Sequence, residues 1–167
     1  SLVSLACLAH IRRKFIEAQR ENKKGKVSKA DQALSFIAKL YAIEKKIKDS
    51  SIEEKYSTRQ LESVPVIEKL KLWLDKSANN TAPKLTIGKA ISYTLNQWPS
   101  FINYIESGEY PIDNNAAENA IRPFVIGRKN WLFSDTQKGA RASANLYGLI
   151  ETAKANDLNT FDYLEKV

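Results

Sequence analysis

The sequence of 167 residues contains one cysteine, one histidine and no methionine. A single cysteine excludes an intramolecular disulfide, which fits a reducing compartment. Cys7 lies in the apolar run of residues 5–9, and we therefore interpret it as a small buried hydrophobic side chain. His10 has no second histidine to act with, so the composition gives almost no support to a zinc site.

The chain also lacks any uninterrupted apolar run that approaches the ~20 residues of a membrane-spanning helix. Residues 1–5 lack the basic region and the long apolar segment of a signal peptide. Because no methionine stands at position 1, we expect the chain to begin inside a longer protein. Residues 2–6 are typical of a buried strand, and a strand needs a partner, so we expect a sheet upstream of this chain.

Acidic residues are fewer than basic ones, 19 against 26, which gives a formal net charge of +7. A balance of this kind suits a polyanionic partner, most often nucleic acid. A solvated basic surface is the less favoured explanation of the overall charge, although the lysine-rich stretch of residues 20–55 is more often such a surface. The hydrophobic fraction of 43% is high enough for a buried core.

Apolar spacing and helix caps predict a mainly helical chain. The predicted helices cover residues 9–24, 28–49, 57–76, 86–97, 99–108 and 138–156, with a short helix after Thr160. Pro65 predicts a kink or break in the third helix, and Pro99 fits the first turn of a separate fifth one. Short strands are expected only at residues 2–7 and 130–133.

The segment from Asp113 to Phe133 differs from the rest, because it gathers an acid, amides and arginines around a helix start. Residues 113–115 are a natural N-terminal cap, Glu118 follows one turn into the helix, and Arg122 follows Glu118 at i+4. We expect this helix to end at Pro123. By spacing alone, an ordinary cap and an i,i+4 pair worth a few tenths of a kcal/mol explain the pattern.

The same segment resembles a known signature. Residues 113–123, followed by Gly127-Arg128-Lys129-Asn130-Trp131-Leu132-Phe133, resemble the C-terminal signature of transposases of the insertion sequence 66 family. We expect residues 127–133 to be irregular or extended. Residues 7–15 resemble a second signature of that family, and the matches at 111–113, 151–156 and 163–164 follow in order, so the resemblance covers nearly the whole chain.

The chain departs from the family pattern at two positions. Asn119 stands where the pattern has arginine, and Ala6 stands where it has glycine. The first departure removes a positive charge beside Glu118 and weakens the case for DNA binding by position 119.

The resemblance implies an RNase-H-like catalytic fold with two aspartates and one glutamate. These three carboxylates hold two divalent ions, normally Mg²⁺, for in-line phosphoryl transfer. Glu118 matches the glutamate as catalytic and metal-binding residue, and both aspartates are expected upstream. With one carboxylate of three, the fragment is expected to be inactive alone and to bind Mg²⁺ weakly.

The implied fold class is a mainly α fragment of an RNase-H-like DDE domain with a large helical insertion and most of the β-sheet missing. Residues 1–20 match the end of the core, residues 21–108 the helical insertion, and residues 109–167 the C-terminal part of the core. The implied activity is DNA strand cleavage and strand transfer in the full-length bacterial protein, in the cytoplasm at the nucleoid.

The implied partners are transposon ends and target DNA, with a homodimer as the transposition complex. The candidates for DNA contact are side chains that carry a positive charge, an amide or a ring that can stack on a base. They are Arg12, Arg13, Arg122, Arg128, Lys129, Asn130 and Trp131. For Arg128 and Lys129 a solvated loop is an equal interpretation. For Trp131 a core position is the favoured interpretation. The competing hypotheses are a helical nucleic-acid-binding or interaction module without catalysis, and a helical scaffold that is basic by chance.

Overall fold

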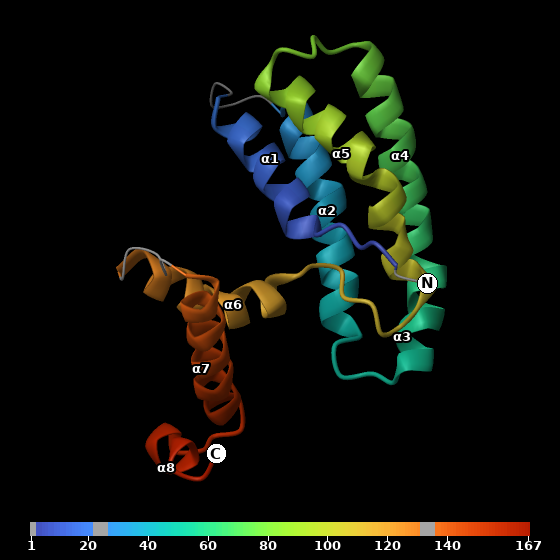
Figure 1. Ribbon diagram of the computed structural model, residues 1–167. Coiled ribbons are helices and arrows are strands. Elements are labelled where there is room, and N and C mark those ends of the chain that lie inside the picture. Colours follow the sequence, from blue (N-terminus) through green and yellow to red (C-terminus); the bar gives the residue numbers. More distant parts are fainter. Residues whose placement is uncertain (1–2, 22–26, 131–135) are drawn as a thin grey trace. The chain divides into compact units, whose positions relative to one another are not determined.

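The computed structural model describes residues 3–21, 27–130 and 136–167 (Figure 1). Contacts divide the chain into unit 1, Ser1–Asn114, and unit 2, Asn115–Val167, each of which is considered by itself. The described residues are mainly helical and contain no strand, which confirms the mainly α prediction. The strand expected at residues 2–7 is wrong for residues 3–7, and most of the one at 130–133 lies outside the described residues. The domain boundaries at residues 20 and 108 stay predictions.

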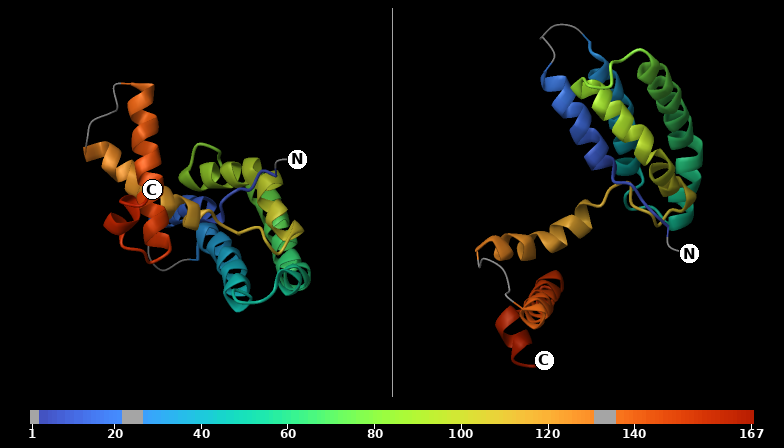
Figure 2. Two further views of the ribbon diagram at one scale, coloured as in Figure 1. Left: turned by 60° about the horizontal axis from the view of Figure 1, so that its bottom comes forward. Right: turned by 45° about the horizontal axis from the view of Figure 1, so that its top comes forward.

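Unit 1 contains a bundle of four helices, in which α1 and α4 each pack against both α2 and α5 (Figures 1 and 2). The helices of the whole unit are α1 (Leu8–Arg20), α2 (Lys29–Lys46), α3 (Ile52–Thr58), the π-helix η1 (Arg59–Ser63), α4 (Val64–Asn79), α5 (Thr86–Ile102) and the 3₁₀-helix η2 (Asn103–Glu106).

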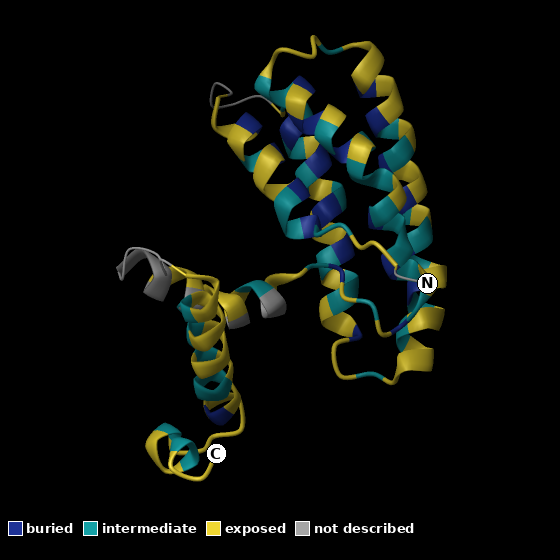
Figure 3. Cartoon of the chain, in the orientation of Figure 1, coloured by how far each residue is buried: buried dark blue, intermediate teal, exposed yellow. Residues whose placement is uncertain are grey.

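Apolar stripes at helical spacing hold this bundle together. On α1 the apolar residues at helical spacing are the buried ones: Leu8, Ile11, Phe15 and Ala18. Figure 3 shows buried positions along the facing sides of the bundle helices and exposed positions on their outer sides. Burial of each large aliphatic or aromatic side chain contributes roughly 1.5–3 kcal/mol, so this core accounts for the stability of unit 1.

Two helices of unit 1 begin with a reciprocal capping box. Ser28 accepts from the backbone N–H of Asp31, whose carboxylate in turn accepts from the backbone N–H of Ser28. Ser51 and Glu54 form the same arrangement at the start of α3. Each box satisfies two backbone donors that a helix start leaves unpaired, and the predicted cap at Ser28 is confirmed.

The third predicted helix is instead a continuous run of α3, η1 and α4. Pro65 lies in the first turn of α4, directly after the π turn of η1. A π turn inserts an extra residue into the helical path, and such a turn provides a place for a proline that cannot donate a backbone hydrogen bond. The α-helical pattern is therefore interrupted before Pro65 without a chain break.

Helix α5 contradicts the prediction of two helices on either side of Pro99, because it runs through that residue as one element. Proline removes one backbone hydrogen bond. Aromatic packing on both sides offsets this loss: the rings of Trp98 and Phe101 lie 5.5 Å apart, and those of Phe101 and Tyr104 also 5.5 Å.

Unit 2 consists of α6 (Asn115–Asn130), α7 (Gln137–Ala155) and α8 (Thr160–Leu164). Helix α6 runs through Pro123 to Asn130, so the predicted end at Pro123 and the irregular backbone at residues 127–130 are wrong. Residues 131–133 lie outside the described residues. A long helix accommodates an internal proline by a local bend. No described helix has the length and apolar character needed to cross a membrane.

Candidate functional site

Glu118 lies in the first turn of α6, which begins at Asn115, and its side chain is half-buried. A carboxylate in this position is stabilised by the positive end of the helix dipole. It is the one acidic residue in the sequence of α6, which also carries Arg122, Arg128 and Lys129. The helix therefore combines a single carboxylate with an excess of positive charge.

The residues that lead into α6 are held by unit 1. The carboxylate of Asp113 accepts a hydrogen bond from the hydroxyl of Tyr41 on α2, at 3.2 Å. Burial of the Tyr41 phenol, aided by the nearby negative charge of Asp113, raises its pKa far above the ordinary value of 10.0. Tyr41 consequently remains a neutral donor at physiological pH.

The neighbours of Asp113 on either side are bonded as well. The backbone N–H of Leu8 donates to the carbonyl oxygen of Ile112 at 3.1 Å. The backbone N–H of Asn114 donates to Sγ of Cys7 at 3.3 Å. Cys7 is half-buried rather than buried, and its sulfur is a hydrogen-bond acceptor at the start of α1.

A second group of contacts surrounds Arg59, which is 2% exposed. Its Nε and Nη2 donate to the two carboxylate oxygens of Glu44, at 2.9 and 2.7 Å. Its Nη1 donates to the carbonyl oxygens of Tyr104 and Ser107, at 3.0 and 2.6 Å. The guanidinium also lies 5.2 Å from the centre of the Tyr104 ring. A buried cation is thereby compensated by charge and by backbone oxygens.

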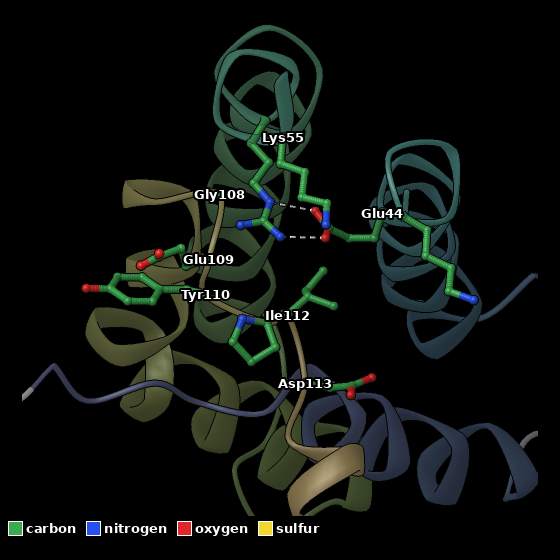
Figure 4. A pocket seen from close by; sticks show the side chains of 10 residues that line it. Glu44, Lys55, Gly108, Glu109, Tyr110, Ile112 and Asp113 are labelled. Atoms are coloured by element: carbon green, nitrogen blue, oxygen red, sulfur yellow. Dashed lines mark hydrogen bonds and ion pairs between the residues drawn. The ribbon is translucent and has the colours of Figure 1, made fainter. Parts of the chain in front are cut away.

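The Arg59–Glu44 pair forms one wall of an open pocket with a cavity volume of about 280 Å³. Figure 4 shows Glu44 and Lys55 reaching into this pocket from different helices, with Asp113 at its edge. Within the described part of the chain, the side chains of Lys48 and Lys55, which also line the pocket, have no hydrogen-bonding or ionic partner. The pocket therefore mixes positive and negative groups and does not select one sign of ligand charge.

The predicted DNA-contact residues fall into both units. Arg12 and Arg13 are exposed on α1, and neither forms an ion pair with another described residue. Arg122 is exposed on α6. The side chains at positions 128–130 and the whole of Trp131 lie outside the description. Each DNA-contact assignment stays a prediction.

Sequence reasoning missed the roles of Arg59 and Tyr41. Arg59 belongs to a helical stretch in which an arginine is expected at the surface, and nothing in its local pattern indicates burial. Tyr41 lies on α2, and its ring is half-buried. Its hydrogen bond spans 72 residues of sequence, and no local spacing reports such a pairing.

Comparison with known proteins gives the family. Residues 1–142 match the model of the Transposase IS66 family, and the chain belongs to this family. The resemblance identified in the sequence is thereby confirmed. No solved structure matches the chain.

Similar proteins occur in Sinorhizobium fredii (strain NBRC 101917 / NGR234). One, described as "Uncharacterized protein y4jD", is 33% identical over 164 residues, which cover 96% of this chain and 31% of the relative. Another, "Uncharacterized protein y4hP", is 32% identical over 170 residues, with 96% and 31% covered. The chain thus spans about a third of the length of these relatives.

Proposed function

We propose that this chain is part of a metal-dependent DNA transposase of the DDE type, in which Glu118 is one of three catalytic carboxylates. The observation that carries the proposal is the position of Glu118 in the first turn of α6, inside the family match over residues 1–142. The two remaining carboxylates are expected to be aspartates outside this chain. RNase-H-like topology belongs to the same proposal.

The chemistry of a single glutamate supports a shared metal site. Mg²⁺ requires about six oxygen ligands in near-octahedral geometry, and one carboxylate supplies at most two of them. Glu118 fits one ligand of a Mg²⁺ site that other carboxylates complete. Such ions, when bound, supply the charge that activates a water or hydroxyl and stabilises the leaving oxygen.

The charge of the chain supports DNA as the substrate. The net charge is +7, and Arg12 and Arg13 are exposed on α1 without an ion-pair partner among the described residues. Cations in this state are available to phosphates, and they bind DNA without reading its sequence. We expect transposon ends and target DNA as partners, and a homodimer as the active assembly.

The decisive experiment is Glu118→Gln in the full-length protein that contains this chain. Glutamine keeps the size and helix propensity of glutamate but removes the charge that binds the metal. Strand cleavage with Mg²⁺ should be abolished, while the melting temperature and DNA binding stay near wild type. Glu68→Gln is the matched control, because Glu68 is an exposed glutamate on α4. Wild-type cleavage by Glu118→Gln contradicts the catalytic assignment.

The alternative is a DNA-binding or interaction module without catalysis. It is supported by the separate core of unit 1, which contains the four-helix bundle. This alternative predicts DNA binding by the full-length protein without any metal-dependent cleavage. The same cleavage assay, run on the wild-type protein with and without Mg²⁺, distinguishes the two functions.

A further inference from the structure

The segment between α5 and α6 is hydrogen-bonded to other parts of unit 1 along most of its length. Its carbonyl oxygens at Tyr104 and Ser107 accept from Arg59, and that of Ile105 accepts from Nε2 of Gln60 at 2.8 Å. Gly108 lies so close to α3 that an added Cβ would be 2.0 Å from the carbonyl oxygen of Ile52. This half of the segment is therefore fixed by η1 and α3.

The other half of the segment is fixed by α2 and by the start of α1. Three consecutive residues take part: Ile112 through its carbonyl, Asp113 through its carboxylate and Asn114 through its N–H. Helix α6 begins at the next residue, Asn115. Of these three contacts, the one from Tyr41 to Asp113 joins two side chains, so a point substitution can remove it without changing the backbone.

We propose that Tyr41 is a positioning residue: by holding Asp113, it fixes the point at which the chain enters α6, the helix that carries Glu118 in its first turn. This inference rests on the proposed function of Glu118. Tyr41 itself belongs to α2 in unit 1 and touches no reacting atom in this role. Through this hydrogen bond α2 would support the start of α6, in addition to any contact that unit 1 makes with DNA.

The surroundings of Tyr41 fit this role. The phenol is half-buried, and its electrostatic neighbours are Asp113, Cys7 and Arg12. The tyrosine supplies a directed hydrogen bond to the Asp113 carboxylate, which a nearby charge without fixed geometry does not replace. Loss of the hydroxyl leaves the aromatic packing in place and removes only the directed bond, which makes Tyr41→Phe a clean variant.

Tyr41→Phe in the full-length protein tests the proposal through metal dependence. A misplaced ligand weakens the metal site, so the Mg²⁺ concentration for half-maximal cleavage should rise several-fold. The cleavage rate at saturating DNA should fall at least about tenfold, because small displacements of reacting groups have effects of this size. The KM for DNA and the melting temperature should stay near wild type. Tyr56→Phe, at an exposed tyrosine of α3, is the matched control.

Hydrogen exchange gives a readout that does not depend on catalysis. The amides of residues 113–118 should exchange faster in Tyr41→Phe than in wild type, while those of the α1 and α5 cores stay protected. Asp113→Ala should reproduce both effects, and adding it to Tyr41→Phe should produce no further loss. Asp113→Asn, which keeps an acceptor oxygen, should restore part of the wild-type behaviour.

The outcomes separate the two proposals. Unchanged exchange at residues 113–118 together with an unchanged Mg²⁺ requirement in Tyr41→Phe overturns the positioning role. Faster exchange in Tyr41→Phe, combined with wild-type cleavage by Glu118→Gln, supports the role of Tyr41 at the start of α6 and refutes the catalytic assignment of Glu118.

Discussion

Arg59 and Glu44 face each other through two parallel hydrogen bonds of 2.9 and 2.7 Å, and their side chains are only 3% and 15% exposed. The pair joins η1 to α2, two elements of unit 1 that are separated in sequence. Bidentate geometry and low exposure distinguish it from surface ion pairs, which contribute little to stability. Removal of this pair should therefore lower the free energy of unfolding of unit 1.

Glu44→Ala leaves the buried Arg59 cation without its carboxylate. We expect a loss of about 3 kcal/mol in the free energy of unfolding, since breaking one side of a buried pair costs roughly this much. Urea denaturation followed by circular dichroism measures it. Asp75→Ala is the control, because its partner Lys71 is an exposed i,i+4 neighbour, and that change should cost at most ~0.5 kcal/mol. Equal effects of the two substitutions would show that burial adds nothing at Glu44.

Substitution of glycine by alanine should have opposite effects on stability at positions 108 and 148. A Cβ at position 108 would collide with backbone atoms of Ile52, whereas a Cβ at position 148 on α7 meets nothing within 4 Å. Gly108→Ala should destabilise unit 1 by more than ~1 kcal/mol, because the α3 backbone has to shift. Gly148→Ala should stabilise α7 by ~0.5–1 kcal/mol through helix propensity. Denaturation and helicity measurements on both variants check the sign.

The helices with complete apolar stripes were predicted well, and each error has a specific structural cause. Leu61 continues the apolar spacing of the third predicted helix, but it is 76% exposed. The π turn at Arg59–Ser63 adds a residue to the helical path, so the stripe of α4 is out of phase with Leu61. Sequence periodicity assumes a constant 3.6 residues per turn and therefore places such a residue on the wrong face.

Prolines caused the other errors of helix length. Pro99 and Pro123 were interpreted as helix boundaries, yet both lie inside helices. At Pro99 the packing of Trp98, Phe101 and Tyr104 offsets the missing hydrogen bond, and this packing depends on tertiary structure. On α7, Leu146 stands at the spacing of an inward residue but is 54% exposed, because within unit 2 that helix packs only against α6 and α8.

The candidate site was predictable only in part. The acid in the first turn of a helix after Asp113 and Asn114 follows from cap chemistry, and the structure places Glu118 in that turn. The bonds that hold this helix start come from Cys7, Leu8 and Tyr41, all distant in sequence. Such contacts exist only once the bundle has formed, so no local pattern indicates them.

The stability of unit 1 should fall in alkali in a way that depends on Tyr104. Burial raises the pKa of Tyr104 to about 12 from an ordinary value of 10.0. A raised folded-state pKa contributes stability that is complete below pH 10 and is lost as the pH rises towards 12. Tyr104→Phe, measured by denaturation between pH 8 and 12, should flatten this loss relative to wild type. Tyr56→Phe, at an exposed ring, should leave the loss unchanged.

The last prediction concerns the two arginines of α1. Arg12→Ala combined with Arg13→Ala should weaken binding of a labelled duplex at low salt, because two cations without ion-pair partners among the described residues are removed. Each lost phosphate contact lowers the slope of log affinity against log salt by about 0.9, so the slope should fall by about 2. Non-specific and specific duplexes should be affected alike, since phosphate contacts carry no sequence information.

The matched control is Lys46→Ala combined with Lys71→Ala, which removes the same charge from lysines that are paired with Glu62 and Asp75. These cations are already neutralised by acids, and their loss should change the salt slope by much less than 2. Titrations of the full-length variants at several salt concentrations give both slopes. If the arginine and lysine variants shift the slope equally, net charge explains the binding. If the arginine variant leaves the slope at its wild-type value, Arg12 and Arg13 make no phosphate contact, and the DNA-binding surface lies elsewhere on the protein.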